Sequence, residues 1–67
     1  MSKTTARMTR FILQNPEGKW ATYDMRSGPY LTDNPNLRYT WDNRQRADQQ
    51  AALYASTLKT TFTVVEV

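Results

Sequence analysis

The sequence predicts an α+β fold, in which a small antiparallel sheet of three to five strands carries one helix across one face. Three observations predict it. Short apolar runs are separated by turn-forming residues. The hydrophobic period changes from two to about 3.6 residues at Asp42. Residues 60–67 close the chain as a run rich in β-branched side chains without Gly or Pro.

The first half of the chain indicates a hairpin. Residues 9–14 are predicted to form a strand, and the turn signal at residues 15–18 ends it. Pro16 sets φ for the first central position of a β-turn, and Gly18 can adopt the positive φ that a bulged hairpin loop needs. The next strand, residues 19–24, should therefore run antiparallel to the first.

Further turns and strands follow before the helix. Residues 25–29 form a second turn signal, residues 30–32 a short extended piece, and residues 33–36 a third turn. Residues 37–41 alternate as a half-buried strand requires and should turn their aromatic side chains toward the core. The inward side chains of this strand would be Leu37, Tyr39 and Trp41, and the outward ones Arg38 and Thr40.

The helix is predicted from residue 43 to about residue 58. Asp42 is the expected N-cap, with Gln45 three residues later at capping-box spacing. One helical stripe is apolar and mostly alanine, which lets the helix lie close to the sheet. The stripe consists of Ala47, Ala51, Tyr54, Ala55 and Leu58. Residues 60–67 then add the final strand.

The 67 residues are sufficient for one domain. We expect a disordered basic tail at residues 1–8 and a single α+β domain at residues 9–67. The bulk of the core should come from the strands, because the helix stripe is small. The predicted core residues are Phe11, Leu13, Trp41, Phe62, Val64, Tyr54 and Leu58.

Composition argues against catalysis. Cysteine and histidine are both absent, so the chain lacks a thiolate nucleophile and the commonest general base and metal ligand. Of the carboxylates, Glu17, Asp33 and Asp42 fall where turns and caps favour them. We expect no enzyme activity, cofactor, metal or small-molecule substrate. The first residues lack the apolar run of a signal peptide, and no segment reaches the 18 or so apolar residues of a membrane span, which favours a soluble cytoplasmic protein.

A resemblance adds to this interpretation. The residues that carry it are the hairpin around Gly18, the run Leu31-Thr32-Asp33-Asn34-Pro35-Asn36, Trp41, the alanines Ala47, Ala51 and Ala55, and the closing Val-Val-Glu-Val. Over residues 9–67 the chain resembles small uncharacterised proteins of tailed phages and prophages. The resemblance implies an accessory or host-directed factor that acts by binding in the host cytoplasm, and it transfers no functional residue.

The sheet face opposite the helix is the leading candidate for a protein interface. If Phe11 and Leu13 face the helix, a second apolar group falls on the other face, which one helix cannot cover. That group is Ile12, Ala21, Tyr23, Val65 and Val67, of which Ile12, Tyr23, Val65 and Val67 are the interface candidates. The expected partner is a host or phage protein, or a second copy in a homodimer, and a sheet edge offers a second docking route.

The alternative is weak binding of nucleic acid. The formal net charge is +3, and a basic surface gains affinity for a polyanion by releasing counterions. Arg44 and Arg46 lie in the first helical turn, where the helix dipole disfavours cations by roughly a few tenths of a kcal/mol each. With Arg38 they could contact phosphate while Trp20 stacks on bases. The interpretation that we favour is that Arg44 and Arg46 are a solvated pair, which the protein tolerates because exposed charges are screened.

Overall fold

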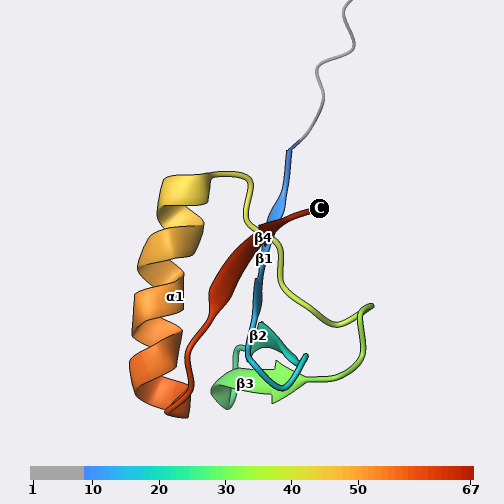
Figure 1. Ribbon diagram of the computed structural model, residues 1–67. Helices are drawn as coiled ribbons and strands as arrows, with labels where there is room; N and C mark the ends of the chain where they lie inside the picture. The colour runs from blue at the N-terminus through green and yellow to red at the C-terminus, as the bar shows by residue number, and fades with distance from the viewer. Residues whose placement is uncertain (1–8) are drawn as a thin grey trace, which may run out of the picture.

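The fold is an antiparallel sheet of four strands with one helix against one face (Figure 1). The computed structural model describes residues 9–67, so the predicted tail at residues 1–8 lies outside the described residues. The elements in chain order are β1 (Phe11–Gln14), β2 (Trp20–Asp24), β3 (Gly28–Thr32), α1 (Arg44–Leu58) and β4 (Thr63–Glu66). The predicted α+β class is confirmed.

The strand order is β3-β2-β1-β4, and all neighbouring strands are antiparallel. β1 and β4 lie far apart in the sequence but pair along their whole length, with Phe11 opposite Glu66 and Gln14 opposite Thr63. The two ends of the described chain are thus joined at one side of the sheet, where β4 is the edge strand.

The β1–β2 hairpin forms where the turn chemistry predicts it. The Oδ1 atom of Asn15 accepts hydrogen bonds from the backbone N–H groups of Glu17 (3.1 Å) and Lys19 (2.8 Å). Gly18 has φ +82°, which a residue with a Cβ rarely adopts. The Asn15 side chain is buried, and its Nδ2 has no hydrogen-bond partner within the described chain. The turn is therefore stabilised at the expense of one unsatisfied donor.

The hairpin opens after the pair Gln14–Trp20, and residues 37–41, the wedge segment, enter between β1 and β2. Trp41 exchanges two backbone hydrogen bonds with Phe11 on β1 (2.8 and 2.9 Å). On the other side, the Tyr39 N–H donates to the Ala21 carbonyl of β2 (3.2 Å).

The strand predicted at residues 37–41 was wrong, because this segment makes one isolated bridge and no ladder. The expected inward positions were also wrong in part, because Leu37 is 52% exposed and Tyr39 is 46% exposed, and only Trp41 is buried. The rings of Tyr39 and Trp41 lie on the same side, 4.7 Å apart, whereas Arg38 lies over Trp20. The two neighbouring strands, β1 and β2, diverge from each other. The wedge segment therefore makes only a few backbone hydrogen bonds to each strand.

The N-cap of α1 is Asn43, so the prediction of Asp42 was wrong by one residue. The backbone of Trp41 is committed to Phe11, and the chain bends at Asp42 before the helix can begin. Asn43 is extended (φ −136°, ψ 123°), and its Oδ1 accepts from the Arg46 N–H at 3.1 Å. The helix ends at Leu58 as predicted, because Lys59 adopts a left-handed conformation with φ 57°.

The core lies between α1 and the sheet. Four predicted core residues are buried there, namely Phe11, Leu13, Trp41 and Tyr54. Phe62 and Val64 are partly buried against them, and Leu58 is half-buried. Ala47 and Ala21 complete the cluster. The Trp41 and Tyr54 rings meet edge to face with centroids 6.0 Å apart, a favourable aromatic geometry.

Candidate protein-binding surfaces

The structure divides the predicted interface residues between two surfaces. Ile12 and Val65 pair across β1 and β4, so both side chains lie on the far face, the sheet face opposite α1. Val67 follows Val65 by two residues and is 53% exposed. Ile12 is only 3% exposed. The chain between β3 and α1 returns along this side of the sheet (Figure 1), which helps to explain that burial.

Two residues expected on the far face lie on the helix side. Ala21 belongs to the core cluster with Leu13, so its predicted position was wrong. The cause is the hairpin register, since Gln14 pairs with Trp20, which puts Trp20 on the far face and turns Ala21 inward. Tyr23 follows Ala21 by two residues in the same strand and shares its side. The far face therefore carries Trp20 in place of Ala21 and Tyr23.

Tyr23 belongs to a different group, the tyrosine cluster of Tyr23, Tyr39 and Tyr54. Tyr23 is 49% exposed and Tyr39 is 46% exposed, whereas Tyr54 is buried between α1 and the sheet. Burial raises the pKa of Tyr54, and the nearby phenols of Tyr39 and Tyr23 raise that pKa further. The three hydroxyl-bearing rings therefore converge from β2, the wedge segment and α1.

A shallow hollow of about 300 Å³ adjoins this cluster, and Tyr39 and Trp41 form part of its wall. Its remaining lining residues are Arg10, Thr40, Asp42 and Arg46. Leu53 is exposed and lies seven residues after Arg46, so it continues the same stripe of α1. Two cations, one carboxylate and an aromatic wall make this hollow suitable for a polar group of a partner, and its shallowness suits a surface contact.

The three candidate arginines lie in three different environments. The guanidinium carbon of Arg38 lies 5.3 Å from the centroid of Trp20, so Arg38 already covers one face of this ring. Arg44 lies 5.8 Å from the Phe11 ring, and the strand pairing puts Glu66 beside Phe11. Arg46 lines the hollow. Arg38, Arg44, Arg46 and Trp20 therefore do not form one continuous basic surface.

Residues 9–67 contain neither a metal-binding cluster nor a membrane-spanning helix. No three acidic, His or Cys side chains of this region gather closely enough to hold a metal ion. Its helix, α1, is too short and too polar to cross a membrane.

Sequence reasoning missed Tyr39 and Leu53 as surface candidates. Tyr39 was expected in the core, because it alternates with Trp41, but the core side of the wedge segment is deep enough to bury only Trp41. Leu53 lies outside the alanine stripe, and an apolar residue on the polar side of a helix was the available signal.

No protein-family model, curated protein or solved structure matches this chain.

Proposed function

We propose that this chain is a small non-enzymatic module that binds another protein, as a phage accessory or host-directed factor in the cytoplasm of the host. The observation that carries the proposal is the tyrosine cluster. Two half-exposed rings, Tyr23 and Tyr39, stand on a buried base that includes Tyr54 and Trp41.

The physical reason is preorganisation. Tyrosine and arginine are enriched among the residues that dominate protein interfaces, because each gives a large contact area together with a polar group. Tyr39 is held by the contact of its ring with the tilted ring of Trp41 and by its backbone hydrogen bond to Ala21. A partner therefore meets a ring that is already ordered, and little conformational entropy is lost on binding. Arg46 and Leu53 extend the same surface.

An affinity pull-down from a bacterial lysate, run with and without nuclease, tests the proposal. We expect a stoichiometric protein that survives nuclease treatment and is lost with the double variant Tyr23→Ala, Tyr39→Ala. The matched control is Tyr30→Ala, because Tyr30 pairs with Thr22 and so faces away from the cluster. Capture of the same protein by the double variant at the parent level would contradict the proposal.

Nucleic-acid binding is the second candidate, and the hollow is the feature that favours it. Arg10 and Arg46 stand there beside Tyr39, so a phosphate and a stacked base could both find contacts. In this case binding should weaken steeply with salt, and Arg46→Ala should reduce affinity. Arg44→Ala is the matched control, since Arg44 lies over Phe11. Nucleic acid recovered alone in the pull-down, and lost on digestion, would favour this candidate over the first.

A further inference from the structure

The outer edge of β4 carries unpaired backbone groups. In an antiparallel pair, alternate residues bond to the neighbouring strand. The Val67 N–H donates to the Arg10 carbonyl at 2.9 Å, so Val65 and Thr63 also face β1. The N–H and C=O groups of Val64 and Glu66 therefore point outward, and no backbone hydrogen bond within residues 9–67 engages them.

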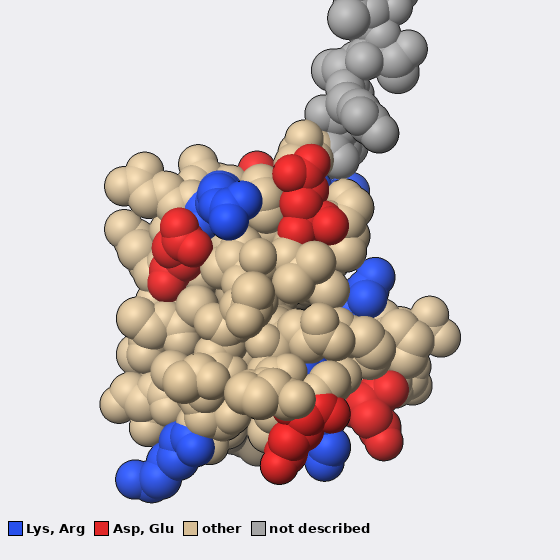
Figure 2. Space-filling view, in the orientation of Figure 1, with Lys and Arg blue, Asp and Glu red and all other residues tan. Residues whose placement is uncertain are grey.

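This edge has no Lys, Pro or bulge to prevent strand addition, although β4 is only four residues long and ends in the charged Glu66. Edge strands are commonly protected by Lys, Pro or a bulge. β4 reads Thr-Val-Val-Glu, and its register with β1 is continuous. Figure 2 views the molecule from the side of β4, and the middle of this surface is free of Lys, Arg, Asp and Glu. An uncharged centre with charges around it is the usual anatomy of a protein interface.

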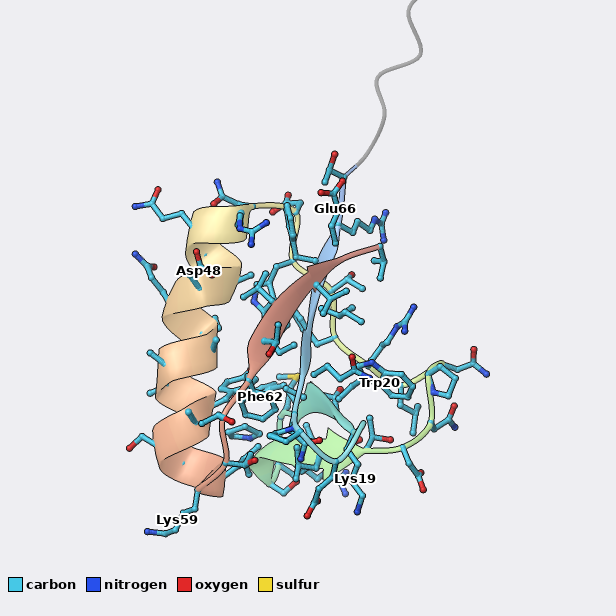
Figure 3. The ribbon with its side chains drawn as sticks, in the orientation of Figure 1. Lys19, Trp20, Asp48, Lys59, Phe62 and Glu66 are labelled. Atoms are coloured by element: carbon cyan, nitrogen blue, oxygen red, sulfur yellow. The ribbon has the colours of Figure 1, made fainter. Side chains whose placement is uncertain are left out.

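The charges at the border of this surface are arranged in a complementary way. Asp48 and Lys59 lie toward opposite ends of α1, as labelled in Figure 3. Asp48 lies on α1, and Lys59 is the left-handed C-cap residue that directly follows the last helical turn, eleven residues further along the chain. Ala52 and Ala55 lie on the Asp48 stripe of α1, between the two charges. Arg44 lies one helical turn before Asp48 and over Phe11, which pairs with Glu66. The charges of Arg44, Asp48 and Glu66 sum to −1, opposite in sign to that of Lys59.

We propose that a second copy of this chain occupies this edge, with β4 antiparallel to β4 about a two-fold axis perpendicular to the sheet. Such an axis exchanges the two ends of the surface. Asp48 of each copy then faces Lys59 of the other, while the alanines between them let the two helices approach. With Val64 opposite its own symmetry mate, Glu66 lies opposite Phe62, and the two Glu66 carboxylates stay apart. The two sheets become one continuous sheet, and the tyrosine cluster remains free, so this inference is independent of the proposed function.

Sedimentation equilibrium of the purified full chain at low salt, over a range of concentrations, measures the association. We expect a reversible dimer. Asp48→Lys alone and Lys59→Asp alone should each weaken it about tenfold, because each replaces two attractive contacts with repulsive ones. The double variant Asp48→Lys, Lys59→Asp should restore most of the affinity, because it restores opposite charges across the interface. Asp was chosen at position 59 because it tolerates the left-handed conformation.

Backbone hydrogen exchange of the unmodified chain gives a second measurement that needs no variant. The amides of Val64 and Glu66 should exchange slowly at high concentration and rapidly at low concentration, whereas the amide of Val65 should be protected at both. A monomer at all concentrations would overturn the proposal. So would a dimer that leaves Val64 and Glu66 unprotected, or one that is insensitive to both single charge reversals.

Discussion

Trp41 connects three parts of the molecule. Its ring packs on Tyr39 and Tyr54, and its backbone pairs with Phe11 on β1. Replacing a buried Trp with Ala costs about 3–5 kcal/mol, and the core of so small a domain rarely supplies more than roughly 3–5 kcal/mol. We therefore expect Trp41→Ala to be unfolded in far-UV circular dichroism, while Trp41→Phe still folds. A cooperative urea transition of the Ala variant near the parent midpoint would contradict this role.

Tyr54 should make the stability sensitive to alkaline pH. Its pKa in the folded protein is raised above the ordinary value of 10.0, chiefly by burial, then by the neighbouring Tyr39 and Tyr23. The folded state therefore holds this proton more tightly than the unfolded chain does. The resulting stability is complete below the unfolded pKa and is lost as the pH rises through the folded pKa.

The measurement is urea unfolding of the parent and of Tyr54→Phe at a series of pH values, from neutral to above about pH 10. The Phe variant cannot ionise at this position, so its free energy of unfolding should fall less over the alkaline range. Tyr30→Phe controls for the loss of a phenol elsewhere, on β3. Parallel alkaline losses in the parent and Tyr54→Phe would show that Tyr54 does not contribute.

At the scale of single elements, the start of α1 is set by Asn43. Its side chain accepts the Arg46 N–H, which otherwise has no partner inside the helix. Asn43→Ala should lower the free energy of unfolding by about 1 kcal/mol. The neighbouring change Asp42→Ala should have a much smaller effect, which thermal or urea unfolding of the two variants can resolve. A larger loss for Asp42→Ala would restore Asp42 as the cap.

Elements determined by local chemistry could be predicted from the sequence. The turn at Asn15–Gly18 depends on one side chain and one glycine, and the helix depends on a repeated stripe, so both formed where expected. The cap was less certain, since Asp42 and Asn43 can both serve and the choice depends on where Trp41 is held. The wedge segment shows the limit most clearly. Tyr39 and Trp41 share a side as predicted, but Leu37 is exposed, and whether the segment joins a ladder depends on how far β1 and β2 diverge.

At the scale of the whole molecule, the sheet order and the composition of the surfaces depend on pairing between distant residues. The register Gln14–Trp20 decides that Ala21 and Tyr23 face the helix, and a shift by one residue would reverse this. For that reason the sequence identified Tyr23 as a surface candidate but grouped it with the wrong neighbours. Tyr39 and Arg46 meet around one hollow only after the wedge segment and α1 have packed.

The central position of β1 makes the fold dependent on β4. β4 pairs with β1 along one edge. Along the other edge, β2 pairs with β1 at Gln14, and Trp41 of the wedge segment pairs with it at Phe11. Ending the chain after Lys59 would remove β4 and expose Ile12 and Leu13, so we expect this variant to lack a cooperative urea transition. Removing Val67 alone deletes one backbone hydrogen bond, to Arg10, and should cost only about 1 kcal/mol. A cooperative transition in the shorter chain would mean that the hairpin, the wedge segment and α1 can fold without the β1–β4 pairing that joins the two ends of the described chain.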